Sequence, residues 1–550
     1  MNLAELMRLD TLAIFCAAFS GLYFVLTVVL SAGYMKGSGA GFRFYLYMLV
    51  TLVATVVALF ADNMLLLLVL WGFLGLMLYL MIGFGTARRT PDTAKKTMII
   101  VGGSDALMLM GLGLLWHLSG QPDIWGMRFS QLHVPIQSGA GVLSFLLLAS
   151  GALAKAGAMP LHTWIPDAAE DAPIPVSAFL PAALDKLLGI YLLGRLVMEV
   201  FGLATSINVI LLAVGAVTVL AGSMMTIVQN DVRRMLGYDA VSQVGYMVLG
   251  FGTGTAVGLA GGLFHMLNHT LYKSSLFFST GRVAKKAGTT DMRELGGYSK
   301  SMPLLFFGFL VAALAAAGVP PLNGFASKWM VYQGILGSTG SPAWLRVPVL
   351  AAAFLGSVLT LAAMMKLTNS VFLGQPSKPV GGKSTFWAGF PVTVLAALCI
   401  LFGVLAQRLP LRYLIFPSIG AEPGGQGIWQ PGMASVLLLG GLLVGLILYL
   451  IGKAWKGARV SKPFVGGVDL EDYPEMRVSG ADFYLTVSEM GPLKRLYALA
   501  EARAFDIYEQ GKQLVFELSG ALGAAHSGVL SRYLGWYLLG MAAILAVLVW

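Results

Sequence analysis

The sequence contains few charged residues and almost no cysteine. Only 11% of its 550 residues are Asp, Glu, Lys or Arg and 57% are hydrophobic, whereas a typical soluble domain is about 25% charged. This balance excludes a soluble globular protein. The two cysteines, Cys16 and Cys399, lie far apart in apolar stretches, which excludes a disulfide framework and the cysteine motifs that hold iron–sulfur clusters.

The chain also lacks the motifs that bind other redox cofactors. No GxGxxG loop follows a predicted strand and no haem motif is present, so we expect no cofactor in this chain and redox cofactors only in partner subunits. The formal charge is +10. Because the basic residues lie between apolar segments, we interpret them as loop charges that orient membrane helices, and we expect no nucleic-acid partner.

Apolar stretches of roughly 20 residues, each long enough to cross a bilayer, recur along most of the chain. We predict an all-α polytopic membrane protein with about fourteen transmembrane helices. Their ranges are 11–33, 42–61, 64–84, 97–118, 140–160, 175–198, 206–228, 235–254, 256–280, 302–337, 347–373, 385–406, 432–452 and 533–550. The 302–337 stretch is too long for one straight crossing and contains Pro320 and Pro321, so we expect a broken helix there.

The loops between these helices alternate between rich and poor in Lys and Arg. The rich loops lie near 34–43, 85–96, 229–234, 281–300, 374–384 and 453–462. Because positively charged loops stay on the cytoplasmic side, the pattern predicts a multi-pass protein of a bacterial or archaeal-type cytoplasmic membrane. The N-terminus is then outside, and the residues after 452 face the cytoplasm.

Residues 453–531 are polar and include a long amphipathic stretch. From Leu493 to Leu522, apolar residues recur at spacings of three, four and seven, which predicts a helix with one apolar stripe. One helix of about 35 residues would be roughly 50 Å long. It carries too many charges to cross the bilayer, so we expect a lateral helix along the membrane or a partner. The alternative is two shorter helices broken near Gly511.

Several ionisable residues fall inside the predicted helices, where a charge is costly and usually marks an ion or proton route. These residues are Asp105, Lys155, Asp185, Lys186, His265, His269, Lys273, Lys328 and Lys366. Some have simpler explanations. Lys366 or Lys186 could reach the headgroups from a helix end, and Asp185 could neutralise its neighbour. A zinc site at the two histidines is disfavoured because no third ligand accompanies them.

His265, His269 and Lys273 are spaced four residues apart. On a helix they project within an arc of about 80°. Two imidazoles and an amine on one face can pass a proton along, because histidine titrates near neutral pH. We therefore predict a relay along this helix, with a packed polar helix interface as the simpler alternative.

Two lysines lie beside predicted helix breaks. Lys155 precedes Pro160, and Lys328 follows Pro320 and Pro321. Interrupted helices in corresponding halves of a chain point to inverted repeats with ion sites near the middle of the membrane. A break also frees backbone groups that can solvate an ion. The pattern predicts one ion site in each half.

Four segments closely resemble one membrane-protein family. They are KAGAMPLHTWIPDAAEDAPIPVSAFLPAALDKLLGIYLLGR, VQNDVRRMLGYDAVSQVGYMVLG, FHMLNHTLYKSSLFFSTG and GVPPLNGFASKW. They resemble the antiporter-like, proton-pumping subunits of respiratory complex I, Mrp-type cation/proton antiporters and membrane-bound energy-converting hydrogenases. The similarity runs from Trp71 to Trp329. The C-terminal stretch resembles the long-tailed members, in which a lateral helix precedes a last membrane helix.

The resemblance implies two inverted five-helix repeats, each with a proton half-channel. It makes Lys155 the central lysine of the first half-channel and Lys328 the terminal lysine of the second, with the histidine helix as the connecting polar axis. The chain departs from the family at two positions. Gly72 stands where a glutamate partner of the first lysine is usual, and Trp329 where an acid often follows the terminal lysine. Asp105, on the next helix, could replace the missing glutamate.

The sequence thus predicts six regions. They are N-terminal transmembrane helices (1–63), a first antiporter-like repeat (64–228), a second repeat (229–373), additional transmembrane helices (374–452), a cytoplasmic-side segment with the lateral helix (453–531) and a C-terminal transmembrane anchor (532–550).

The predicted function is an H⁺- or Na⁺-translocating subunit of a redox-driven complex, similar to complex I or an energy-converting hydrogenase. The expected partners are other antiporter-like membrane subunits along the lateral helix and hydrophilic redox subunits. The alternatives are a subunit of a multi-subunit secondary Na⁺/H⁺ antiporter and a scaffold subunit with impaired channels.

Overall fold

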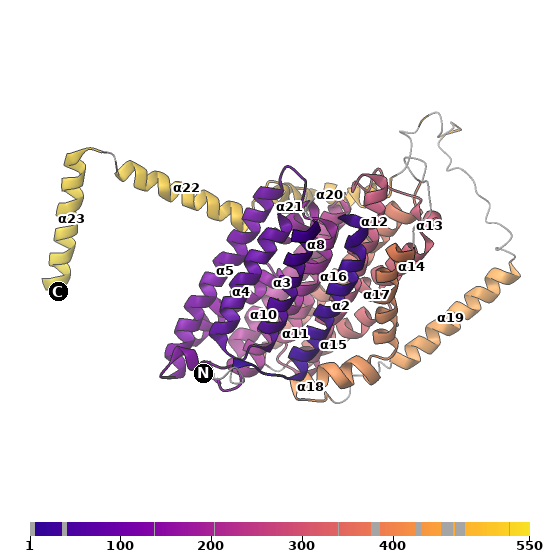
Figure 1. Ribbon diagram of the computed structural model, residues 1–550, viewed down its shortest axis with the longest axis horizontal. Helices are drawn as coiled ribbons and strands as arrows, with labels where there is room; N and C mark the ends of the chain where they lie inside the picture. Colours follow the sequence, from indigo (N-terminus) through magenta and orange to yellow (C-terminus); the bar gives the residue numbers. More distant parts are fainter. Residues whose placement is uncertain are drawn as a thin grey trace. The chain divides into compact units, whose positions relative to one another are not determined.

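The computed structural model describes residues 6–35, 41–136, 138–202, 204–338, 340–375, 386–423, 431–452, 466–467, 473, 479–526 and 528–549. Throughout these residues the regular secondary structure is helical (Figure 1). Most of residues 453–478, the first part of the predicted polar segment, lies outside the described residues. The chain divides into two compact units, residues 1–490 and 491–550.

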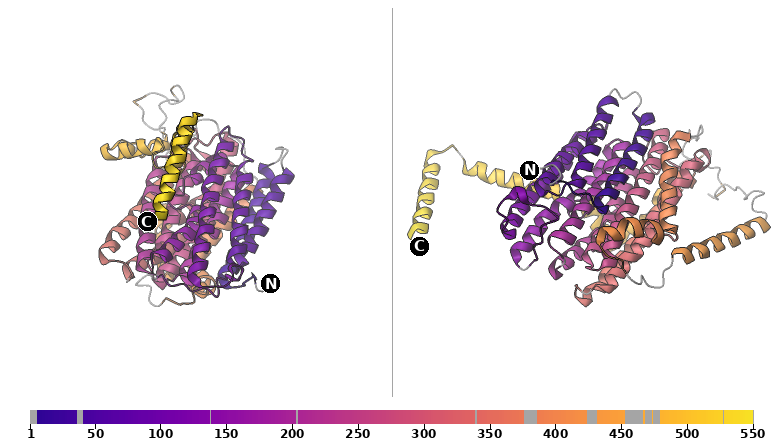
Figure 2. Two further views of the ribbon diagram at one scale, coloured as in Figure 1. Left: turned by 90° about the vertical axis from the view of Figure 1, so that its left-hand side faces the viewer. Right: turned by 60° about the horizontal axis from the view of Figure 1, so that its bottom comes forward.

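The first unit contains most of the helices. They are α2 (Thr11–Tyr34), α3 (Gly41–Phe60), α4 (Met64–Ile82), α5 (Thr90–Ser119), α6 (Gly139–Ala156), α7 (Trp164–Asp171), α8 (Ile174–Phe179), α9 (Asp185–Arg195), α10 (Thr205–Val228), α11 (Val232–Gly252), α12 (Ala256–Ala287), α13 (Tyr298–Ser301), α14 (Pro303–Ala317), α15 (Asn323–Gly337), α16 (Ala343–Thr368), α17 (Phe386–Val404), α18 (Phe416–Ile419), α19 (Pro431–Ile451) and α20 (Leu485–Glu489). The long helices from α2 to α16 run side by side as a bundle (Figures 1 and 2).

Side-chain caps set the start of several helices. Asp10 begins α2, Asn63 begins α4 and Asp231 begins α11. Each of these side chains accepts hydrogen bonds of 2.8–2.9 Å from backbone N–H groups of the first turn, which would otherwise have no partner. These caps fix where each chain segment enters the bundle.

The bundle encloses its polar residues within an apolar core and exposes apolar side chains on its outer helices. The inner helices α9, α11 and α12 are buried along almost their whole length. The outer helices α3, α5 and α16 expose large apolar side chains such as Phe42, Leu109 and Phe354. Lipid offers no hydrogen-bond partners, so polar groups at membrane depth must lie inside the bundle. The chain is therefore a multi-pass membrane protein.

Both predicted helix breaks are confirmed. The first separates α6 from α7 and the second separates α14 from α15. Gly157 and Gly318 end the leading segments with φ angles of 85° and 83°, in the left-handed region that favours glycine. At the first break, the indole Nε1 of Trp164 donates to the carbonyl of Ala154 at 2.9 Å, so a side chain from beyond the break binds a carbonyl that the helix leaves free.

The expected count of about fourteen crossings is not confirmed. Among the described residues, nine helices are long and apolar enough to cross a membrane, or up to ten if the bent pair Gly389–Val404 and Gln407–Ile419 is one span. Windows 235–254 and 256–280 form α11 and α12, which are long enough but carry many buried polar residues. Window 302–337 forms two helices of 15 residues each. The breaks and the buried polar residues thus account for much of the difference.

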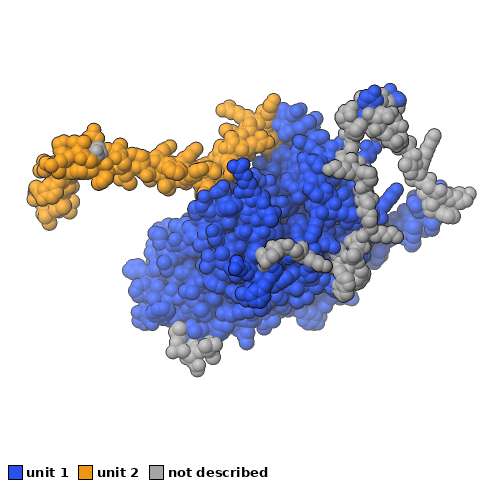
Figure 3. Space-filling view, turned by 45° about the horizontal axis from the view of Figure 1, so that its top comes forward, with its two compact units in different colours: residues 1–490 blue, residues 491–550 orange. Residues whose placement is uncertain are grey.

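The second unit contains α21 (Gly491–Glu501), α22 (Ile507–Ala525) and α23 (Leu530–Val549) (Figure 3). The expected single lateral helix is therefore two helices. The break lies at residues 502–506, where Arg503 has a φ of 59° and the Asp506 side chain accepts from the backbone N–H of Tyr508 at 3.1 Å. The alternative of two helices was therefore right in number, but its break position, Gly511, lies inside α22.

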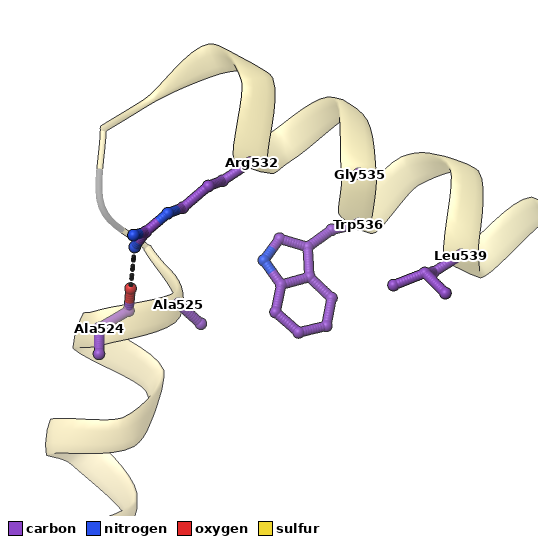
Figure 4. A pocket seen from close by; sticks show the side chains of 6 residues that line it. All are labelled: Ala524, Ala525, Arg532, Gly535, Trp536 and Leu539. Atoms are coloured by element: carbon purple, nitrogen blue, oxygen red, sulfur yellow. Dashed lines mark hydrogen bonds between the residues drawn. The ribbon is translucent and has the colours of Figure 1, made fainter.

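A small hollow lies between the end of α22 and the start of α23 (Figure 4). Arg532 Nη1 donates to the carbonyl of Ala524 at 3.4 Å, and the side chains of Trp536 and Leu539 complete the lining. The one charged side chain in the hollow already binds a backbone carbonyl, and the lining contains no acid or histidine. The hollow is therefore not a candidate for ion chemistry.

Candidate functional site

The structure connects all of the predicted ionisable residues except Lys366 as successive neighbours inside the bundle. We call this set the buried row. Its members are Asp105 of α5, Lys155 of α6, Asp185 and Lys186 of α9, His265, His269 and Lys273 of α12, and Lys328 of α15. Neighbouring members lie close enough for their charges to act on one another. All except Asp105 are at most 3% exposed.

Lys155 occupies the last turn of α6, just before the first break. Its Nζ donates to the backbone carbonyl of Trp71 at 3.2 Å and lies 4.4 Å from the centre of the Trp71 ring. Asp105 and Asp185 are the carboxylates whose charges act on this amine. An aromatic face and a carbonyl can both stabilise an ammonium ion, and these two groups surround the Lys155 amine in place of a directly bound acid.

Asp105 lies beside the glycines of α4. A Cβ added to Gly72 would stand 3.9 Å from Asp105 Oδ2, and one added to Gly75 would stand 3.5 Å from it. The carboxylate therefore borders the space that a side chain at residue 72 would enter. Its Oδ1 is buried with no hydrogen-bond partner among the described residues, which leaves it able to bind water or a proton.

Asp185 and Lys186 begin α9 in the centre of the bundle. Lys186 Nζ lies 5.9 Å from the ring centre of Trp164, and a Cβ added to Gly157 would stand 3.3 Å from it. Both Lys186 Nζ and Asp185 Oδ2 are buried without a hydrogen-bond partner in the part of the chain that the structure describes. Buried polar groups of this kind usually bind internal water, so a hydrated space is expected here.

The three residues of the predicted relay share one face of α12, but only one histidine is hydrogen-bonded. His265 Nδ1 lies 2.9 Å from Ser327 Oγ, and His265 Nε2 lies 3.4 Å from the hydroxyl of Tyr272. Neither ring nitrogen of His269 has a partner among the described residues. A proton that passes from Lys273 to His265 through His269 would therefore need water between the groups.

The sequence reasoning missed Asp239 of α11. Its Oδ2 forms a hydrogen-bonded ion pair with Lys273 Nζ, and both side chains are at most 1% exposed. Gln243, one turn later, donates from Nε2 to Asp239 Oδ1 at 3.2 Å. The signal was present, because Asp239 is an ionisable residue inside the predicted helix 235–254.

Lys328 lies just after the second break. Its Nζ donates to the carbonyl of Ala316 in the last turn of α14 at 2.9 Å and lies 4.6 Å from the ring centre of Tyr246. Trp329, at the position where the family often has an acid, stacks on Phe325 with ring centres 5.9 Å apart. The terminal lysine thus has an aromatic and a carbonyl contact, as Lys155 does.

Lys366 lies apart from the buried row. Its Nζ donates to the carbonyls of Ile227 and Gln229 at 3.0 and 2.9 Å and to Asn230 Oδ1 at 3.3 Å. These groups stand at the end of α10, whose last carbonyls have no helical partner. The amine therefore caps a helix from a neighbouring helix, a contact that supports the end of α10.

A second group of ion pairs surrounds α7 and was also not predicted. Lys96 Nζ binds Asp167 Oδ2 at 2.8 Å, and both side chains are at most 10% exposed. Arg234 joins Asp167 and Glu170, and Arg89 also binds Glu170. The basic members come from the ranges 85–96 and 229–234, which were predicted as loops. In the structure, Lys96 lies in the first turns of α5 and Arg234 in the first turn of α11, so this ion cluster fixes α7 to the starts of α5 and α11.

The buried row brings together groups that can take up and release protons in a region without bulk water. Amines, imidazoles and carboxylates exchange protons directly or through water, and each change of charge alters the affinity of its neighbours for a proton. In the described part of the chain, no three or more His, Cys, Asp or Glu side chains are grouped as metal ligands. The chemistry that this arrangement supports is proton transfer between neighbouring groups.

Comparison with known proteins places this architecture in a family. A family model described as "NADH:quinone oxidoreductase/Mrp antiporter, TM" matches residues 61–356, more than half of the chain. Solved structures share the fold. The chain aligns over 98% of its length with 89% of a chain of the membrane-bound sulfane sulfur reductase, an archaeal respiratory complex, with a TM-score of 0.77 and 23% identity. The chain also aligns over 75% of its length with 85% of a chain of respiratory complex I from Thermus thermophilus, with a TM-score of 0.65 and 23% identity.

Curated relatives have related names. The chain is 32% identical over 371 residues to formate hydrogenlyase subunit 3 of Escherichia coli. This alignment covers 63% of this chain and 59% of that protein. It is 32% identical over 437 residues to F(420)H(2) dehydrogenase subunit L of Methanosarcina mazei, covering 74% and 64%. It is 30% identical over 458 residues to one Na(+)/H(+) antiporter subunit of Alkalihalophilus pseudofirmus, covering 76% and 56%. The alignments thus span less than two thirds of each relative. The chain belongs to the family of membrane subunits shared by NADH:quinone oxidoreductases and Mrp antiporters.

Proposed function

We propose that this chain is an antiporter-like subunit that translocates H⁺ or Na⁺ in a multi-subunit, redox-driven membrane complex. The observation that carries the proposal is the buried row, which links the two broken helices through α9 and α12, helices that are buried along almost their whole length. Ionisable groups at this depth are costly and are typically found where ions move.

The energies involved are sufficient for transport against a membrane potential. Moving one elementary charge across 100 mV costs about 2.3 kcal/mol. An opposite charge that comes within about 4–6 Å favours an ammonium ion by roughly 1.4–4 kcal/mol. In the upper part of this range, which exceeds about 2.3 kcal/mol, altering the charge of an acid near Lys155 can load or release a proton against a physiological potential.

In the first repeat, we assign the role of the missing acid to Asp105. The Asp105 carboxylate borders the space beside Gly72 and acts on Lys155 from α5. This placement argues against a scaffold with decayed channels, because a decayed site has no reason to retain a buried acid beside an amine.

The driving electrons must come from partners. We assign redox cofactors, iron–sulfur centres among them, to hydrophilic partner subunits, because the chain has only two cysteines. We assign the N-terminus to the outside and the polar C-terminal segment to the cytoplasmic face, because loops rich in Lys and Arg tend to stay in the cytoplasm. The α22 side chains Leu514, Val515 and Leu518 are more than half exposed, which suits a lateral contact with another membrane protein of the complex.

A second candidate is a subunit of a secondary Na⁺/H⁺ antiporter without redox partners. It is favoured by the similarity to the Na(+)/H(+) antiporter subunit of Alkalihalophilus pseudofirmus. The subunits that co-purify with the native chain separate the two candidates, since only the redox-driven complex contains iron–sulfur proteins.

The proposal is tested in inverted membrane vesicles that contain the assembled complex. A pH-sensitive dye and a sodium electrode follow ion movement, driven by electron transfer or by an imposed sodium gradient. Lys155→Ala is expected to abolish ion movement and to leave assembly intact. Lys95→Ala, at a side chain that is 60% exposed, is the matched control and is expected to change neither. Normal ion movement in Lys155→Ala would refute the proposal.

A further inference from the structure

Asp239 has a position that no other acid of the bundle shares. Among the described residues, it is the only carboxylate that forms an ion pair with a lysine of the buried row. The pair joins α11 to α12, and both side chains are fully enclosed, with Asp239 1% and Lys273 0% exposed. The other lysines of the row contact backbone carbonyls or aromatic rings instead.

The Asp239 carboxylate is held in place from two sides. Its Oδ1 accepts from Gln243 Nε2 at 3.2 Å, and the same amide nitrogen lies 3.2 Å from Thr360 Oγ1 of α16. Its Oδ2 faces Lys273. The amide therefore fixes one oxygen and leaves the other as the acceptor for an ammonium ion.

The charge of Asp239 also reaches the terminal lysine. Asp239 is the acid and Lys273 the base whose charges act on Lys328. Among the described residues, the Lys328 amine contacts the Ala316 carbonyl and the Tyr246 ring. One carboxylate therefore binds the amine of Lys273 on α12 and acts through its charge on the amine of Lys328 on α15.

The helix that carries Asp239 corresponds to the helix with the missing glutamate. α11 stands two long helices before the broken pair α14 and α15, as α4 stands two before the broken pair α6 and α7. On α4 the family usually has an acid, and here it has Gly72. The acid that is missing from this helix of the first repeat is present on the corresponding helix of the second.

We propose that Asp239 is the shared counter-charge of Lys273 and Lys328. As a result, only one of the two amines is protonated to an ammonium ion at a time. The inference rests on the proposed ion-translocating function and names the group that couples its last two steps. With Asp239 ionised, one ammonium ion leaves the group neutral, whereas two would leave a net positive charge at membrane depth.

Protonation of Lys328 therefore drives deprotonation of Lys273, and the reverse. One proton enters an N–H bond of one amine as one proton leaves the other, toward the side of His269 or toward Ser327. No other bond forms or breaks, and the net charge of the group is the same before and after. The two lysines thus act as one site with two exits.

The simpler role for Asp239 is a static ion pair that holds α11 against α12. The polar and charged groups that face its carboxylate are Lys273 and Tyr272 of α12, Lys328 of α15, Gln243 of its own helix and, through the Gln243 amide, Thr360 of α16. A static pair and a shared counter-charge differ in what happens to proton loading when the charge alone is removed.

Two substitutions separate these roles in the assembled complex. Asp239→Asn removes the charge and keeps an oxygen that can accept from Gln243, and Asp239→Glu keeps the charge. Asp92→Asn is the matched control, because its carboxylate pairs with Lys95 at the surface and is 79% exposed. Dye-detected ion movement is measured between pH 6 and pH 9, together with the amount of assembled complex.

A shared counter-charge predicts that Asp239→Asn assembles normally, loses about tenfold or more in ion-coupled turnover, and shifts the alkaline limb of its pH profile to lower pH by about one unit, because an amine without its acid loads a proton less readily. Asp239→Glu is expected to keep at least half of the turnover. If Asp239→Asn does not assemble, Asp239→Glu decides, and an assembled but inactive Asp239→Glu complex overturns the inference.

An Asp239→Asn complex with the wild-type turnover and pH profile also overturns it. The proposed function is judged separately, by Lys155→Ala and Lys328→Ala. If both of these lose ion movement while Asp239→Asn keeps it, only the role of Asp239 is wrong. If Lys155→Ala keeps normal ion movement, the proposed function itself is wrong.

Discussion

The carboxylate of Asp105 stands beside Gly72, with Oδ2 3.9 Å from the position that a Cβ at residue 72 would take. The two residues lie on neighbouring helices, α5 and α4, and together they form a site with one acid where the family usually has a glutamate on α4. We propose that Asp105 supplies to Lys155, from α5, the negative charge that a glutamate on α4 would supply.

This relationship predicts that one acid can replace the other. Asp105→Asn should lower ion-coupled turnover about tenfold, because Lys155 loses one of the two carboxylates that act on it. Adding Gly72→Glu should restore a large part of the turnover by returning a carboxylate from α4. Dye-detected ion movement in vesicles measures both variants. A double variant no better than Asp105→Asn alone would show that the two positions do not serve the same amine.

The second break depends on a close approach of two backbones. A Cβ added to Gly324 would stand 1.8 Å from the carbonyl oxygen of Ala315, and backbone cannot move aside as a flexible side chain can. Gly324→Ala should therefore destabilise the protein by about 1–3 kcal/mol or more. Thermal unfolding in detergent measures the change.

Gly337→Ala is the control for this prediction, because Gly337 ends the same helix and has nothing within 4 Å of an added Cβ. It should be neutral or slightly stabilising. Equal effects of the two substitutions would contradict the packing described at the break.

Lys366 is predicted to stabilise the fold rather than to carry ions. Lys366→Met removes the donor from the Ile227 and Gln229 carbonyls and should cost about 1–3 kcal/mol, seen as a lower midpoint of thermal unfolding. Turnover per assembled complex should stay above half. Lys300→Met, at an exposed lysine, controls for the loss of a positive charge. An unchanged midpoint with lost ion movement would place Lys366 on the ion path.

The ion cluster around α7 should contribute far more stability than a surface pair. Asp167→Asn removes the acid that binds both Lys96 and Arg234 and should cost about 3–5 kcal/mol, because it leaves buried positive charge without that partner. Asp92→Asn breaks an exposed pair and should cost no more than about 1 kcal/mol. Denaturation of the two variants side by side measures the difference. A cost for Asp167→Asn near that of the surface pair would mean that the cluster is well solvated.

Much of the fold could be predicted from the sequence, because its signals are local. Apolar runs gave α2, α3, α4 and α10 with ends within a few residues of those found. Proline and the left-handed glycines Gly157 and Gly318 mark both breaks. The break between α21 and α22 was missed, although Asp506 is a helix-capping residue type, because the apolar spacing continues across it.

The candidate site was predictable in its members but not in its contacts. Charged residues inside apolar runs identified the buried row. Whether Lys366 joins that row depends on α10, whose end lies 137 to 139 residues away in sequence. Asp239 was overlooked because its partner Lys273 lies 34 residues away on another helix, and one sequence does not show which buried charges meet.

The central claim is that the buried amines carry the transported charge. The most direct test is the number of ions moved per electron pair, or per exchanged cation, by the assembled complex with Lys155→Ala and Lys328→Ala combined, compared with Lys95→Ala. We expect the contribution of this chain to fall to zero in the double variant, while the control keeps the wild-type ratio. A wild-type ratio in the double variant would contradict it.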